Sequence, residues 1–201
     1  SPSHYDKIDK TKQAINHQSL SEKCFLSDVH FQTPSRKGAS IMAFDGIVIA
    51  NLTYDLKNKL EGGKINKIAQ PEKDELLFTV KNNRETLRLL VSANASLPLV
   101  CFTDTNKPSP LTAPNFCMLL RKHIGTGRIV KIHQPGLERI IEFTIEHLDE
   151  MGDLQKKRLI VELMGKHSNI IFCKEDGTIL DSIKHIPAQV SSVREVLPGR
   201  T

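Results

Sequence analysis

The sequence predicts an α+β protein, built as a mostly antiparallel β-sandwich with flanking helices. Short apolar segments of strand-like composition fill most of the chain after residue 127, whereas helical apolar spacing occurs in two stretches before it. Turn signals such as Asn82-Asn83 and Glu175-Asp176-Gly177 separate neighbouring segments, as they do in hairpins. These observations together predict about eight short strands and two helices around one core.

The first helix is predicted to begin at Asp45, whose carboxylate can cap the first turn, and to end before Gly62-Gly63. Its apolar residues recur every four positions, so one face carries Val48, Leu52, Leu56 and Leu60. Strand patterns follow this helix, and we assign them to residues 64–70, 75–81, 86–92 and 99–102.

The second helix is predicted to begin around residues 112–114, with Pro114 in its first turn. It would bury Phe116, Leu119, Leu120 and Ile124 before residues 125–127 stop it. Arg121 and Lys122 lie in its last turn, where positive charge complements the helix dipole. Contact of these two cations with a ligand is an equally open interpretation.

The remaining strands are predicted at residues 128–134, 139–147, 157–164, 168–174 and 178–186. In the second of these, Ile141, Phe143 and Ile145 alternate with polar residues. This alternation predicts a strand with one buried face and one face in water.

Composition sets limits on location and organisation. The chain has 201 residues, a net charge of +5 and 39% hydrophobic residues, enough for one core of ordinary size. Its apolar runs are much shorter than the roughly 18–20 residues of a membrane span. The cysteines (Cys24, Cys101, Cys117, Cys173) form no CxxC and suggest reduced thiols in a cytoplasmic protein. Residues 1–41 lack sustained periodicity and read as a leader or disordered tail, and residues 42–201 as the folded domain.

A polar segment near the end of the chain, residues 165–169, is the first candidate site. Lys166, His167, Ser168 and Asn169 lie between two strand-like runs, whereas a hairpin turn needs only two such residues. A cation, an imidazole and two short polar groups suit a phosphate or nucleic-acid backbone. The alternative is a wide connection whose Ser168 and Asn169 bond their own backbone. Lys184 and Arg194 could extend the site into a basic patch, or could protect a sheet edge.

Glu138 and Arg139 form the second candidate site, at the entry to a strand. An exposed ion pair is the simpler interpretation, worth less than about 1 kcal/mol. The functional interpretation is an Arg139 that binds phosphate or a base, with Glu138 orienting it or accepting a hydrogen bond.

Motifs for catalysis or cofactors are missing from the sequence. Residues 61–64 follow a helix and precede a strand, the reverse of a nucleotide cradle. His167 and Ser168 are adjacent and suggest no catalytic triad, and the histidines have no metal-ligand spacing. We therefore expect a non-catalytic binding domain with no metal and no cofactor.

Six motifs, in order, resemble the NFACT family. They occupy residues 42–47, 60–71, 116–123, 136–140, 164–169 and 197–199, so the resemblance runs through residues 42–201. The family includes bacterial ribosome quality-control factors, also labelled fibronectin- or fibrinogen-binding proteins, and eukaryotic relatives. The resemblance implies that this chain is an N-terminal fragment of a longer protein, with a fold like the N-terminal domain of formamidopyrimidine-DNA glycosylases.

The resemblance also implies partners and a site. Family members bind the large ribosomal subunit carrying peptidyl-tRNA and recruit alanyl-tRNA for alanine tailing, while the ribosome performs peptidyl transfer. Their Asp-Arg motif falls on Glu138-Arg139, where Glu138 departs from the family by one methylene.

Two other functions remain open at this stage. The family label allows a surface adhesin that binds fibronectin or fibrinogen, although the sequence has no recognisable export signal. A DNA glycosylase is a more distant alternative, because residues 42–44 offer neither the N-terminal proline nor the adjacent glutamate of those enzymes.

Overall fold

The computed structural model describes residues 45–187 and 196–200 of the chain. The predicted leader and Arg194 lie outside these residues. The elements, in chain order, are α2 (Gly46–Leu60), β1 (Lys64–Glu72), β2 (Glu75–Asn82), β3 (Glu85–Ser92), β4 (Leu99–Phe102), α3 (Asn115–Ile124), β5 (Arg128–His133), β6 (Ile140–Leu148), β7 (Leu154–Glu162), the short 3-10 helix η1 (Gly165–His167), β8 (Asn169–Lys174) and β9 (Ile179–Ser182).

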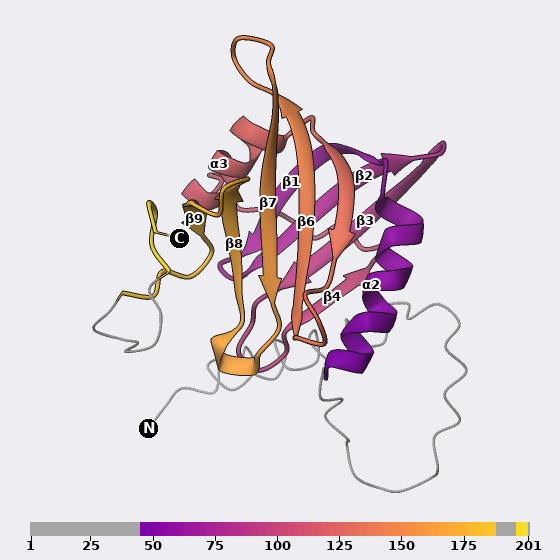
Figure 1. The fold of residues 1–201 in the computed structure, drawn as a ribbon, viewed down its shortest axis with the longest axis vertical. Coiled ribbons are helices and arrows are strands. Elements are labelled where there is room, and N and C mark those ends of the chain that lie inside the picture. Colours follow the sequence, from indigo (N-terminus) through magenta and orange to yellow (C-terminus); the bar gives the residue numbers. More distant parts are fainter. Residues whose placement is uncertain (1–44, 188–195, 201) are drawn as a thin grey trace, which may run out of the picture.

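The strands form one antiparallel sheet of nine strands, in the order β4-β3-β2-β1-β5-β6-β7-β8-β9. Two meanders are joined where Lys64 of β1 pairs with Arg128 of β5. Figure 1 shows β6–β8 in front of β1–β3, and one cluster of buried side chains contains residues of both halves, such as Phe78 and Phe172. The antiparallel α+β prediction is thus confirmed, but a single continuous sheet replaces the two sheets of a sandwich. The likeness to the glycosylase domain stays a prediction.

In Figure 1, α2 lies at the right of the sheet, against β5, β2 and β6, and α3 lies at the left, against β1 and β6. Both helices bury apolar side chains in the same core cluster. Asp45 caps α2 as predicted, because its Oδ1 accepts hydrogen bonds from the main-chain N–H groups of Ile47 (3.1 Å) and Val48 (2.9 Å). Pro114 is the N-cap of α3 and not a residue of its first turn, because the helix begins at Asn115, just after the predicted start at residues 112–114.

Two local predictions need correction. The β2–β3 turn is formed by Asn83 and Arg84, which have φ of 46° and 68°, one residue later than predicted. Asn82 instead pairs with Glu85 in the sheet. Cys117 and Cys173 are reduced thiols as predicted, but Cys101 is disulfide-bonded, because sequence spacing does not reveal which cysteines meet in space.

None of the helices in the described residues is long and apolar enough to cross a membrane.

Candidate functional site

Glu138 and Arg139 lie in the turn that leads into β6, and both side chains are exposed. The main-chain N–H of Leu163 donates to the carbonyl of Arg139 at 2.9 Å, which ties this turn to the end of β7. Glu162 in turn pairs with Asn169 at the start of β8, so η1 and the Glu138–Arg139 turn share one end of the sheet. We call this end the η1 end.

The N-terminus of α2 positions the Glu138–Arg139 turn. The side-chain amide of Gln134 donates to the carbonyls of Gly46 (2.9 Å) and Glu138 (2.8 Å), so it bridges the helix and the turn. Gly46 permits the close approach, because a Cβ at this position would lie 1.9 Å from the carbonyl oxygen of Leu137. The turn is therefore held by backbone contacts, and its two charged side chains remain free to point outward.

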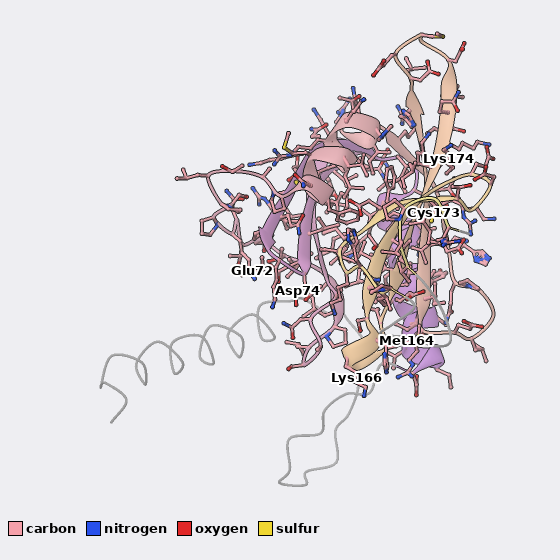
Figure 2. All side chains as sticks on the ribbon, turned by 90° about the vertical axis from the view of Figure 1, so that its left-hand side faces the viewer. Glu72, Asp74, Met164, Lys166, Cys173 and Lys174 are labelled. Carbon is pink, nitrogen blue, oxygen red and sulfur yellow. The ribbon has the colours of Figure 1, made fainter. Side chains whose placement is uncertain are left out.

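Lys166 and His167 are the exposed residues of η1. Gly165 begins this turn with φ of 57°, a conformation that suits glycine, and the N–H of His167 donates to the carbonyl of Met164 at 3.1 Å. Figure 2 shows Lys166 at the lower tip of the folded domain, close to Met164. The structure therefore brings the predicted pair Lys166 and His167 to the same end of the sheet as Arg139.

Ser168 and Asn169 are fully buried and hold the backbone, which was the alternative interpretation of this segment. Ser168 Oγ accepts a hydrogen bond from the N–H of Met164 at 2.9 Å. Asn169 Oδ1 accepts from the N–H groups of Ile170 (2.9 Å) and Lys184 (3.0 Å), and its Nδ2 donates to the carbonyl of Lys184 (3.0 Å). These two residues cannot contact a ligand directly, and their assignment as binding residues is corrected to a supporting role.

Lys184 also departs from the prediction. Its side chain is half-buried, and its ammonium group donates to the carbonyl of Ala93, so it points towards the end of β3. Burial lowers the pKa of Lys184, while nearby Asp74 opposes that shift. The predicted basic patch therefore consists, in the described residues, of Arg139, Lys166 and His167.

Arg121 and Lys122 lie at the opposite end of the sheet from the η1 end. Arg121 Nε donates to the carbonyl of Ile68 at 2.8 Å, which anchors α3 on β1. Lys122 lies 3.5 Å from Glu150, which follows the far end of β6. The structure therefore does not bring these two cations together with Arg139.

The η1 end presents cations without partner carboxylates. Neither Arg139 nor Lys166 forms an ion pair with another described residue. An arginine fork and an ammonium group that are both free can bind a phosphate or the edge of a base, with Glu138 as a neighbouring acceptor. In residues 45–187 and 196–200, no group of three or more His, Cys, Asp or Glu side chains could hold a metal ion.

Sequence reasoning missed a second group of cations. Lys64, Lys81 and Arg128 line an open hollow of about 460 Å³ beside the C-terminal end of α2. They are far apart in the sequence and belong to three different strands, so only the register of the sheet brings them together. In the sequence, the one indication that these cations could lie together was that each lies near the end of a predicted strand.

Comparison with known proteins places the chain among characterised relatives. The sequence profile for "NFACT N-terminal and middle domains" matches residues 45–201. The Rqc2 homolog RqcH of Bacillus subtilis is 42% identical over 160 residues, which are 79% of this chain and 28% of that protein. Ribosome quality control complex subunit 2 of Saccharomyces cerevisiae is 29% identical over 101 residues, which are 50% of this chain and 9% of the yeast protein.

A solved structure has the same fold. The N-terminal domain of the fibronectin-binding protein PavA from Streptococcus pneumoniae superposes with a TM-score of 0.76 and 38% sequence identity, covering 79% of this chain and 60% of that one. The chain therefore spans less than a third of the Bacillus relative and about three fifths of the solved domain.

Proposed function

This chain belongs to the NFACT family, and from that membership we propose that its folded domain is an RNA-binding module of a ribosome quality-control factor. The observation that carries the proposal is Arg139, an exposed arginine without an ion-pair partner among the described residues, held at the η1 end with Lys166 and His167. Phosphate contacts of this kind supply most of the affinity of proteins for nucleic acids.

We assign tRNA and the large ribosomal subunit carrying peptidyl-tRNA as the partners. Arg139 would bind a phosphate or a base edge of the tRNA through its fork of N–H donors. Glu138 keeps the carboxylate of the family's Asp-Arg pair but extends it by one methylene, so it would accept a hydrogen bond from a slightly different position. Lys166 and His167 would contact the neighbouring backbone.

The domain would act by positioning and not by chemistry. It would hold alanyl-tRNA for alanine tailing of stalled chains, and the peptidyl transferase centre of the ribosome would form the bond. This role needs no cofactor and no metal, and it would place the protein in the cytoplasm.

The test is to recover large ribosomal subunits with this chain and to sequence the tRNA that accompanies them. We expect one tRNA to be enriched with the wild type and lost with Arg139→Ala, and Lys166→Ala to weaken recovery. Lys131→Ala, which removes an exposed cation from β5, serves as the matched control. Equal recovery by Arg139→Ala and Lys131→Ala would show that the η1 end is not the RNA site.

A second candidate function follows from the PavA structure, whose protein is named for binding fibronectin. Under this alternative the same domain would bind fibronectin or fibrinogen at the cell surface. Saturable fibronectin binding that resists salt, without enrichment of any tRNA, would favour the adhesin over the RNA-binding module, because phosphate contacts weaken steeply as salt rises.

A further inference from the structure

A second basic surface lies at the other end of α2, the upper end in Figure 1. Lys81 of β2 pairs with Lys64 of β1, and Lys64 pairs with Arg128 of β5. Residues directly opposite each other on neighbouring strands project from the same face, so the three cations form one row across the sheet. We call Lys81, Lys64 and Arg128 the cation row.

The backbone pairing places Lys64 and Arg128 especially close. The N–H of Ile65 donates to the carbonyl of Gly127 (2.8 Å), and the N–H of Ile129 donates to the carbonyl of Gly63 (2.9 Å). These two bonds flank the Lys64–Arg128 pair, which is therefore the narrow, non-hydrogen-bonded kind, in which side chains lie closest. Like charges opposite each other destabilise a sheet, so the contacts of Lys64 with Lys81 and Arg128 cost stability. Glu146 of β6 lies opposite Arg128 and offsets this cost only at the β5 end of the row.

Protection of a sheet edge does not explain the row. Charged residues often guard edge strands, but β1 lies inside the sheet between β2 and β5. Lys64 is paired with a residue of β2 on one side and of β5 on the other, so no strand edge is exposed at this position.

Capping of α2 explains only part of the row. The C-terminal carbonyls of the helix are partly satisfied by Asn82, whose amide donates to the carbonyls of Lys59 (2.9 Å) and Glu61 (3.2 Å), and Arg128 donates to the carbonyl of Gly62. Lys64 and Lys81 take no part in these bonds and form no ion pair with a described residue.

The hollow beside the row holds one carboxylate, that of Glu61, which is already engaged. Glu61 Oε1 accepts a hydrogen bond from the main-chain N–H of Ile132 at 2.8 Å. Asn66 and Asn83 add amide donors to the lining, so donors and cations predominate in an open space of about 460 Å³. This composition suits a phosphate group.

We propose that the cation row binds a phosphate group of the RNA backbone, as a second contact beyond the η1 end; this inference rests on the proposed RNA-binding function. The two surfaces lie at opposite ends of α2, whose 15 residues span about 22 Å. One phosphate cannot reach both, whereas one polynucleotide can. The row would thus fix the orientation of the RNA that Arg139 binds.

The first arm of the test uses inorganic phosphate. We expect phosphate to shift the NMR amide signals of Gly62, Lys64 and Asn83 saturably in the wild type, and not in the double variant Lys64→Gln/Lys81→Gln. The control double variant Lys131→Gln/Lys174→Gln removes two exposed cations that do not line the hollow. Absence of wild-type shifts at these amides would overturn the phosphate site, whatever the outcome with RNA.

The second arm measures tRNA affinity against salt concentration. Each lost phosphate contact lowers the slope of log K against log salt by about 0.7–0.9, so the row variant should lose up to about twice that relative to the control. An unchanged slope in a row variant that no longer binds phosphate would mean that the row takes free phosphate, and would overturn the RNA assignment.

Arg139→Ala separates this inference from the proposed function. Suppose that the wild type binds tRNA, that Arg139→Ala binds it equally well, and that the row variant binds it more weakly. This result would refute the η1 end as the RNA site and support the row. A wild type that binds no tRNA would refute both RNA assignments, and the phosphate titration would then decide whether the row is an anion site.

Discussion

The ammonium nitrogen of Lys157 lies 3.1 Å from Nε2 of His147, and each residue is only 8% exposed. Nδ1 of His147 lies 3.1 Å from the carbonyl of Leu148 and must be the protonated nitrogen that donates to it. Nε2 therefore carries a lone pair and accepts a hydrogen bond from Lys157. A proton added to Nε2 would break this bond and place two cations in contact.

This pair predicts that acid destabilises the protein. Burial lowers the pKa of His147, and it lowers the pKa of His123, whose ring centroid lies 6.1 Å from that of His147. The unfolded state therefore binds more protons than the native state between these lowered pKa values and about 6.5, so stability rises with pH there. Lys157 acts in the same direction at higher pH, because burial lowers its pKa too, with Lys174 adding to the shift.

We expect the free energy of unfolding to fall as pH drops from about 7.5 to 5.5, by at most about 1.4 kcal/mol per pH unit for each histidine that takes up a proton. Urea unfolding followed across this range would measure the slope. His147→Gln should reduce it, and His167→Gln, on the exposed η1 turn, controls for the loss of an imidazole. Equal slopes in the wild type and His147→Gln would contradict the prediction.

Asn169→Ala should destabilise the fold by about 2–4 kcal/mol, because it removes the acceptor of the N–H groups of Ile170 and Lys184. It also removes one of two donors to the carbonyl of Lys184, which keeps the hydrogen bond from Ser182 Oγ. Chemical unfolding would measure the loss. Asn66→Ala, at an exposed position of β1, is the matched control and should change stability little. A small effect of Asn169→Ala would mean that the side chain is not the anchor of this sheet end.

Gly46→Ala should move the Glu138–Arg139 turn, because the added Cβ would lie 1.9 Å from the carbonyl oxygen of Leu137. Overpacking of this kind costs about 1–3 kcal/mol. We expect a lower melting temperature together with weaker tRNA binding. Ile47→Ala, which trims a side chain that is 67% exposed, controls for changes in the same helix turn. Retained binding in Gly46→Ala would separate the turn from the RNA site.

Arg84→Gly should stabilise the protein by about 0.5–1 kcal/mol, because Arg84 has φ of 68° and glycine adopts this conformation without strain. The gain is limited by the greater freedom of glycine in the unfolded chain. Thermal unfolding would measure it, with Arg84→Lys as a control that keeps both the charge and the strain. A lower melting temperature for Arg84→Gly would contradict the prediction.

Local structure was largely predictable, because its causes are local. The Asp45 cap, the strand of alternating residues at Ile141, Phe143 and Ile145 and the exposure of Lys166 follow from residues close together in the sequence. The position of a turn was predicted wrongly by one residue where a predicted turn residue also bonds a distant part of the chain. The β2–β3 turn begins one residue late because Asn82 also holds the end of α2.

The candidate site was only partly predictable, because its membership depends on side-chain direction. Lys184 was grouped with Lys166 from the order of the strands, but its ammonium group turns inward to Ala93. Ser168 and Asn169 have the composition of a binding loop, yet both are buried and bond backbone groups. No local pattern separates a buried asparagine from an exposed one in such a turn.

The sequence by itself determined which segments are helices, strands and turns, since apolar periodicity, caps and turn residues act over a few positions. Only the tertiary structure decided which cations share a surface. Arg139 and Lys166 share one end of the sheet because β6 begins, β7 ends and β8 begins there. Lys64, Lys81 and Arg128 form one row because β2, β1 and β5 are in register. The physical reason is that strand register joins residues far apart in the chain, and it is set by packing across the whole sheet.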